Sequence, residues 1–183
     1  MSRIKGSQLV FVVKSLRASG AIDRNNLPPH LERYFQERVL AGLWYPESDF
    51  RDLTLMLGRL LEPHVEGNVW RFLGLSGAQR DFASTYASMV KKGDTHWTVE
   101  RMAPGWRQFR DSGTLKVASL ETGRAELALR SYPVMCAELA DINAGYFEGV
   151  VQASGATDVK VEVIEFDESS ARWSMRWHEP WAD

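Results

Sequence analysis

The apolar residues change their spacing near Leu115, and this change constrains the fold more than any other feature of the sequence. Before Leu115 they recur with the helical period of about 3.6 residues, and after it they alternate with the strand period of two. Residues 115–130 and 159–177 each predict a β-hairpin, and residues 133–154 between them predict a long helix. This ββαββ order favours a four-stranded antiparallel sheet with one face covered by the helix.

The first 112 residues are expected to be helical. Gly74 and Gly77 separate two of the predicted helices, and Pro104 is expected to kink or break the last one. The predicted helices cover residues 9–16, 31–40, 48–61, 65–75, 79–90 and 95–110. We therefore predict an α+β protein with a single domain over residues 1–183. It consists of a helical part (1–112), a ββαββ part (113–178) and a short tail (179–183).

Composition excludes several classes of protein. Apolar residues make up 44% of the 183 residues and the net charge is −2, so a packed core is expected and a dedicated nucleic-acid binder is not. A local basic patch of Arg101, Arg107 and Arg110 stays open. The apolar run from Leu9 to Val13 is too short for a signal-peptide core or a membrane span, so a soluble cytoplasmic protein is expected.

Residues with catalytic or metal-binding chemistry are few and scattered. The single cysteine, Cys136, allows no intrachain disulfide and makes a cysteine-based zinc site improbable. The four histidines lie far from one another in sequence, and none forms a metal-binding pair at helical spacing. No nucleophile, base and orienting group can be assembled, so an enzyme is the least favoured class of function.

Seven tryptophans are many for a chain of this length. Aromatic residues usually build the core, but some can line a pocket for an apolar ligand. Six residues are predicted as candidates for such a ligand pocket: Trp70, Trp97, Trp106, Tyr132, Cys136 and Tyr146.

Small residues form a narrow face on the predicted helix 133–154. They are Ala140, Ala144, Gly145 and Gly149. Small side chains let two backbones approach closely, so this face predicts either packing on a neighbouring element or the interface of a homodimer. Both alternatives stay open.

Three stretches near the end of the chain resemble a known superfamily. They read Gly145-Tyr-Phe-Glu-Gly149, Gly155-Ala-Thr-Asp-Val-Lys-Val-Glu-Val-Ile-Glu-Phe166 and Arg172-Trp-Ser-Met-Arg-Trp177. They resemble the closing helix and hairpin of the superfamily that includes H-NOX haem domains, TRAPP subunits and 4-vinyl reductase domains. Within it, the chain is most similar to a paralogous family of uncharacterised myxobacterial proteins. The resemblance implies a fold that commonly encloses an apolar pocket and often dimerises.

The chain departs from this superfamily where relatives bind cofactors. The resemblance places the Tyr-x-Ser-x-Arg motif that binds the haem propionates at Leu129–Pro133, where only Ser131 agrees, and Arg101–Trp106 lacks the proximal histidine. The last hairpin lacks the cysteines that hold zinc in some relatives. Neither haem nor zinc is expected.

These observations predict a non-enzymatic regulatory or protein-interaction module, with an unknown protein partner or a second copy as its partner. A small apolar ligand is the expected mechanism of regulation. The alternatives are a dedicated small-molecule sensor with a hydrophobic pocket and an enzyme of unknown class.

Overall fold

The computed structural model describes residues 2–23, 27–83 and 86–179. Most of the predicted tail, residues 180–183, lies outside the described residues. The chain divides into two compact units: unit 1 comprises Met1–Glu66 and Phe109–Asp111, and unit 2 comprises Gly67–Gln108 and Ser112–Asp183. The division therefore does not follow the predicted boundary near residue 112. Two helices of the predicted helical part belong instead to the unit that contains the ββαββ segment.

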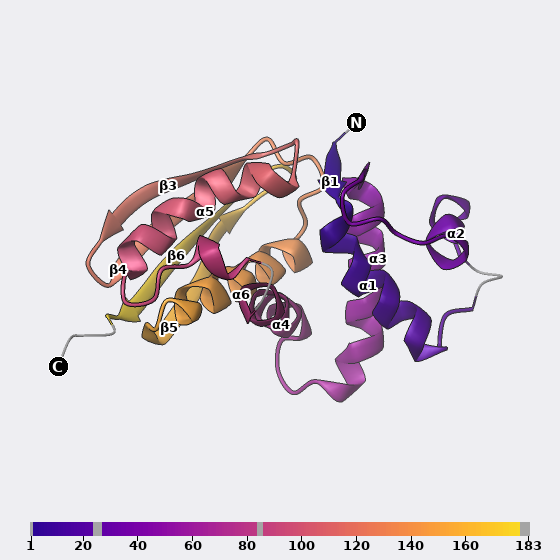
Figure 1. Cartoon of the computed structure of the whole chain (residues 1–183), viewed down its shortest axis with the longest axis horizontal. Helices are drawn as coiled ribbons and strands as arrows, with labels where there is room; N and C mark the ends of the chain where they lie inside the picture. Colours follow the sequence, from indigo (N-terminus) through magenta and orange to yellow (C-terminus); the bar gives the residue numbers. More distant parts are fainter. Residues whose placement is uncertain (1, 24–26, 84–85, 180–183) are drawn as a thin grey trace. The chain divides into compact units, whose positions relative to one another are not determined.

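In its described residues, unit 1 contains three α-helices and a short two-stranded ribbon (Figure 1). Its elements are β1 (Arg3–Lys5), α1 (Gly6–Ser19), α2 (Pro29–Gln36), β2 (Trp44–Pro46), α3 (Glu47–Leu61) and the 3-10 helix η2 (Glu62–His64). The predicted helix at residues 9–16 lies within α1, which buries Leu9, Val12, Val13 and Leu16. This ribbon was not predicted, because strands of three residues are too short to show alternation.

The segment Phe109–Asp111 is part of unit 1 because it pairs with β1. Ile4 forms a β-bridge with Arg110, and the backbone N–H of Asp111 donates to the carbonyl of Arg3 at 3.1 Å. The Arg3 guanidinium also donates to the Asp111 carboxylate at 2.6 Å. Burial alone would raise the pKa of Asp111, but the hydrogen bonds from Arg3 outweigh it and lower this pKa below its usual value.

Unit 2 contains the predicted four-stranded antiparallel sheet. Its elements are α4 (Val69–Ala83), the 3-10 helix η3 (Ala87–Met89), α5 (Thr95–Phe109), β3 (Thr114–Glu121), β4 (Arg124–Arg130), α6 (Ala137–Ala153), β5 (Thr157–Phe166) and β6 (Ala171–His178). The strand order is β3-β4-β6-β5, and every neighbouring pair is antiparallel. The α+β class, the ββαββ order and the sheet are thus confirmed.

The alternation of the strands sets which face of the sheet is buried. On β6 the side chains of Ala171, Trp173, Met175 and Trp177 are buried, and the residues between them are more exposed. Trp173 is fully buried and packs edge-on against Phe147 of α6, with 5.1 Å between ring centroids. Its indole N–H donates to the carbonyl of Ala140 at 3.0 Å. The helix therefore covers the face that the sequence predicts.

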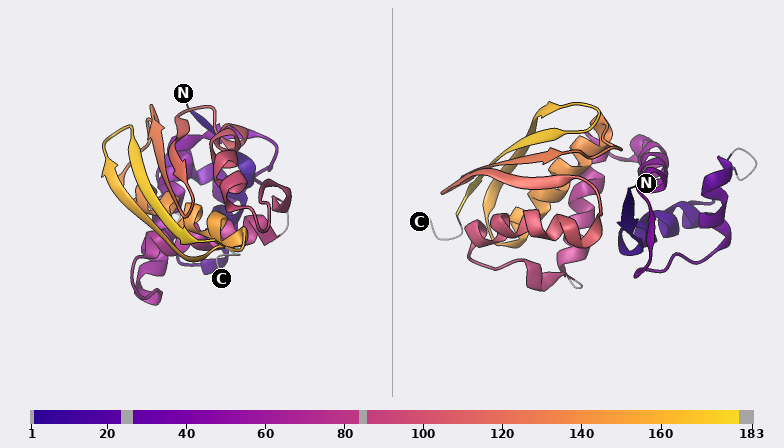
Figure 2. Two further views of the ribbon diagram at one scale, coloured as in Figure 1. Left: turned by 90° about the vertical axis from the view of Figure 1, so that its left-hand side faces the viewer. Right: turned by 90° about the horizontal axis from the view of Figure 1, so that it is seen from above.

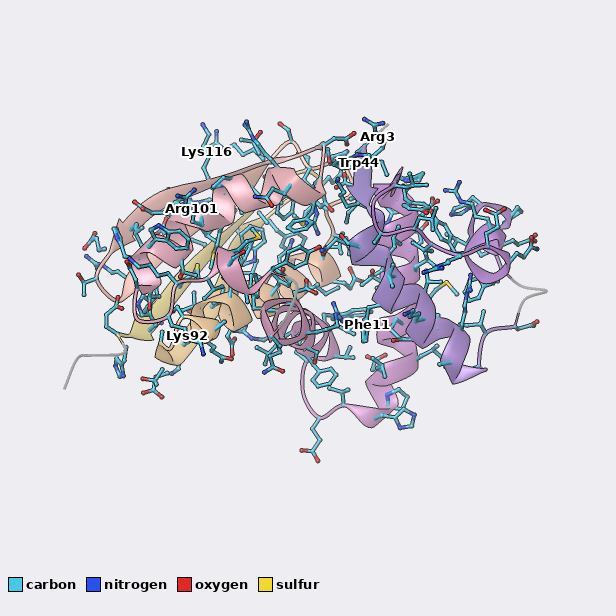
Figure 3. The ribbon with its side chains drawn as sticks, viewed as in Figure 1. Arg3, Phe11, Trp44, Lys92, Arg101 and Lys116 are labelled. Carbon is cyan, nitrogen blue, oxygen red and sulfur yellow. The ribbon has the colours of Figure 1, made fainter. Side chains whose placement is uncertain are left out.

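The opposite face of the sheet is polar. Arg172 pairs there with Glu126 at 2.8 Å and with Glu165 at 3.4 Å, and Lys116 projects from β3 (Figure 3). Exposed pairs of this kind contribute little to stability, typically ~1 kcal/mol or less each. This face has the character of a solvated surface.

Helix α6 lies between the sheet and α4, which makes unit 2 three layers deep there (Figure 2). The approach of α4 and α6 depends on glycine. A Cβ added at Gly74 would overlap the carbonyl oxygen of Ile142, and one added at Gly145 would overlap that of Arg71. Gly74 is thus an interior residue of one continuous helix, α4. Its missing side chain lets the backbone of α4 pack directly against α6. The predicted separation of two helices at Gly74 and Gly77 is wrong.

The small residues of α6 are buried inside unit 2. Ala140 and Ala144 are at most 1% exposed, and Gly145 and Gly149 pack against α4. The structure therefore gives these residues the first of their two predicted roles, packing on a neighbouring helix. Their role in a homodimer interface stays a prediction. In the part of the chain described, no helix is both long enough and apolar enough to cross a membrane.

Candidate functional site: a hollow on helix α5

The candidate site is a hollow of about 290 Å³ between one side of α5 and the segment before it. From α5 it is lined by Trp97, Arg101, Pro104, Gly105 and Gln108. These positions are three to four residues apart and form one stripe along the helix. The other wall is Ser88 and Met89, at η3. We call this site the α5 hollow.

Asp94 fixes the start of α5 and thereby the position of Trp97. Its carboxylate accepts a hydrogen bond from the backbone N–H of Trp97 at 3.0 Å and one from the Lys91 ammonium at 2.6 Å. This is an N-cap of the usual kind. The hydrogen bond from Lys91 and that from the Trp97 backbone lower the pKa of Asp94, so the cap stays charged well below neutral pH.

Pro104 and Gly105 shape the middle of the hollow. Proline cannot donate a backbone hydrogen bond, yet α5 runs through Pro104 as one helix from Thr95 to Phe109. Of the two predicted effects of Pro104, a kink or a break, the break is therefore wrong. Gly105 leaves room for Met89, since an added Cβ would lie 3.0 Å from the Met89 Cε. This contact lets the wall at η3 approach the helix.

Arg101 supplies the charge of the hollow. Its guanidinium lies 4.9 Å from the centre of the Trp97 ring, which is a cation–π contact, and the residue projects from α5 (Figure 3). Among the described residues no carboxylate pairs with Arg101, whereas Arg71 in the same unit pairs with Glu148 at 2.6 Å. The hollow therefore has a positive charge that the described chain does not neutralise.

The predicted pocket residues are dispersed. Of the six, only Trp97 lines the α5 hollow. Trp106 and Tyr132 do lie together, packed edge-on with 5.2 Å between ring centroids, but both are buried in the core. Tyr146 packs near Phe82 on the side of α6 that faces α4.

The remaining two candidates lie elsewhere in unit 2. Trp70 is a half-buried residue in the first turn of α4, and Cys136 is a half-buried residue at the N-cap of α6. The role of the six as a ligand pocket remains a prediction, and the structure does not bring them into one site.

The three arginines of the possible basic patch do not share one helix. Arg110 lies beyond the end of α5 in unit 1, beside the buried Glu47, and Arg107 is exposed but does not line the hollow. Sequence reasoning missed the pairing of Arg101 with Trp97. Their four-residue spacing on a predicted helix was the signal that could have indicated it.

Residues 34–178 match the profile of the family described as Protein of unknown function (DUF2378). The match covers most of the chain. The chain belongs to this family. None of the curated proteins matches it.

Solved H-NOX domains share the fold of this DUF2378 chain. A variant of the Tt H-NOX domain superposes with a TM-score of 0.65 at 16% identity, over 97% of this chain and 96% of that one. An oxygen-binding H-NOX domain related to soluble guanylate cyclases gives 0.62 at 14% identity, over 98% of both chains. The unliganded Fe(II) H-NOX protein from K. algicida gives 0.60 at 11% identity, over 98% of this chain and all of that one. At such identities the likeness shows the fold alone, and it confirms the H-NOX part of the predicted resemblance.

The residues of this DUF2378 chain do not fit a haem held by a histidine. All four histidines are exposed: His30, His64, His96 and His178. The side chain of His30 is 51% exposed and that of His178 is 73% exposed. The buried side of α5 carries threonine, valine, methionine and tryptophan instead. Among the described residues no group of three histidine, cysteine or acidic side chains could hold a metal ion.

Proposed function

We propose that this chain is a regulatory module that binds a small ligand, and that it does so without haem and without catalysing a reaction. The observation that carries the proposal is the α5 hollow, where Trp97, Met89 and Arg101 provide apolar surface together with an unneutralised charge. Concave sites that combine apolar walls with a few polar groups are the usual form of small-molecule sites. One of the H-NOX domains that share this fold is described as oxygen-binding, which makes a ligand-binding role consistent with the fold.

The polar residues argue for binding rather than catalysis. Two histidines lie near carboxylates, His30 at 3.4 Å from Asp52 and His178 at 3.0 Å from Asp158. Both pairs are largely exposed and neither lines the α5 hollow. A general base acts on a substrate held within hydrogen-bond reach, and neither pair lies at the hollow that we propose as the ligand site.

Haem titration tests the cofactor part of the proposal. Haemin added to the purified protein, then reduced, is expected to give no stoichiometric complex and no absorption spectrum of histidine-ligated ferrous haem, because no histidine is buried. The His96→Ala variant serves as the control, since His96 is the histidine on α5. A one-to-one complex whose histidine-ligated spectrum is lost in His96→Ala would overturn the proposal.

A second candidate function, a protein-interaction module, is favoured by an exposed apolar segment in unit 1. Leu40, Leu43 and Trp44 are 48%, 54% and 38% exposed and lie within five residues of one another. If this patch joins two copies, light scattering will show a mass that rises with concentration, and Leu43→Ser with Trp44→Ser will abolish the rise. A wild-type protein that stays monomeric at high concentration removes the homodimer form of this candidate.

A further inference from the structure

We propose that the α5 hollow recognises a small planar carboxylate, an aromatic acid whose carboxylate pairs with Arg101 and whose ring lies against the apolar wall. This inference rests on the proposed function, because it names the chemical class of the ligand for the same site. Three features of the hollow carry it: its charge, its apolar wall and its size.

The charge of the hollow selects an anion. The Arg101 guanidinium has the Trp97 ring as its neighbour and no carboxylate partner among the described residues. A guanidinium presents its N–H groups in a planar fork that matches the two oxygens of a carboxylate. A cation–π contact with Trp97 does not use a carboxylate, so the N–H donors of this fork can still pair with the carboxylate of a ligand in the hollow.

The apolar wall selects a flat ring. Met89 and Pro104 contribute apolar side chains, and Gly105 between them adds no side chain that would fill the hollow. A methionine sulfur makes favourable contacts with aromatic rings. A ligand with a ring next to its carboxylate can therefore contact this wall and Arg101 at the same time.

The size and rim of the hollow limit the ligand further. A volume of about 290 Å³ lies just below the usual range for ligand pockets, which is roughly 300–1,000 Å³. One small ring acid fits this volume better than a drug-sized molecule does. Ser88 and Gln108 add a hydroxyl and an amide, which suit a ligand that also has a hydroxyl or carbonyl group.

The surrounding charges are compatible with an anion. Arg107 and Lys92 are exposed cations close to the hollow in sequence, and Glu100 is the acidic neighbour of Arg101 on α5. Glu100 precedes Arg101 by one residue, so it points to a different side of the helix and does not line the hollow. The site therefore has one lining charge, and that charge is positive.

The test compares 2-naphthoate with 2-naphthamide, which has the same ring but no charge. Binding is measured by titration calorimetry and by the NMR signal of the Trp97 indole N–H, identified with a Trp97→Phe variant. We expect 2-naphthoate to bind and to shift this signal, and 2-naphthamide to bind at least about tenfold more weakly. Arg101→Gln should weaken the binding of 2-naphthoate by about tenfold or more. Arg101→Lys should weaken it less, because lysine keeps the charge but lacks the planar fork of N–H donors.

Arg107→Gln is the matched control, an exposed arginine on the same helix that does not line the hollow. It should leave naphthoate binding unchanged, and an equal loss in both glutamine variants would overturn the inference by showing only a long-range charge effect. Equal binding of acid and amide, insensitive to Arg101→Gln, would overturn the inference and leave ligand binding at the hollow intact. If neither compound shifts the Trp97 signal, both the inference and the hollow as a ligand site fall.

Discussion

Gly145→Ala is expected to destabilise unit 2 by about 3 kcal/mol or more, although alanine is the better helix former. A Cβ at residue 145 would overlap the carbonyl oxygen of Arg71 and press on the backbone of Leu75, so α4 and α6 must move apart. Forcing extra atoms into a packed contact costs roughly 1–3 kcal/mol and more when backbone must shift. This cost exceeds the ~1 kcal/mol that alanine gains over glycine in a helix. Urea unfolding followed by circular dichroism measures the difference.

Gly77→Ala in α4 is the control for this prediction. The nearest atom to its added Cβ is Cδ2 of Tyr146 at 3.7 Å, which is ordinary contact. The helix propensity of alanine should therefore prevail, and the variant should be more stable than wild type by up to about 1 kcal/mol. Equal effects of the two substitutions would contradict the close approach of α4 and α6.

Arg110→Leu is expected to destabilise unit 1 by about 3–5 kcal/mol. The carboxylate of Glu47 is fully buried at the start of α3, and the Arg110 guanidinium lies 3.8 Å from it with its side chain only 12% exposed. Removing the arginine leaves a buried carboxylate beside an apolar side chain, and desolvation of the charge then opposes folding. Thermal and urea unfolding both measure the loss.

The double variant Glu47→Leu with Arg110→Leu separates charge burial from lost packing. It removes both charges, so it should recover most of the stability that Arg110→Leu loses. Arg107→Leu is the surface control and should change stability by less than about 0.5 kcal/mol. A double variant as unstable as the single one would show that Arg110 acts through packing, for example on the Phe50 ring at 5.8 Å.

The sheet could be predicted from local sequence, because the alternation of apolar and polar residues is visible within each single strand. Trp173, Met175 and Trp177 face one way on β6, as their period of two requires, and the turn at Thr122-Gly123 lies where β3 and β4 meet. The predicted start of α3 at residue 48 lies within one residue of the observed start at Glu47, and α1 continues past residue 16 to end before Gly20, which has a φ of 63°.

Elements that depend on distant partners were predicted badly. The glycines of α4 looked like helix ends, but Gly74 is an interior residue that makes room for α6. Pro104 was expected to kink or break its helix, but α5 continues through it without a break. The ribbon of β1 and β2 could not be predicted, because its pairing joins residues that are about 40 positions apart.

The candidate site was predicted in part. Trp97 was named from its residue type alone, and its partner Arg101 was considered only as part of a basic patch. The aromatic candidates Trp106 and Tyr132 turned out to form core, because each ring finds the other as an apolar neighbour once the chain is folded. Residue type indicates what a side chain can bind, and burial decides whether a ligand can reach it.

The sequence by itself therefore determined the α+β class, the ββαββ order and the face of the sheet that is buried, because these follow from periodicity within single elements. Only the tertiary structure decided the role of Gly145, the burial of Glu47 beside Arg110 and the hollow around Arg101. Each of these depends on atoms from elements far apart in sequence, and no local period encodes which backbone will lie against a given residue.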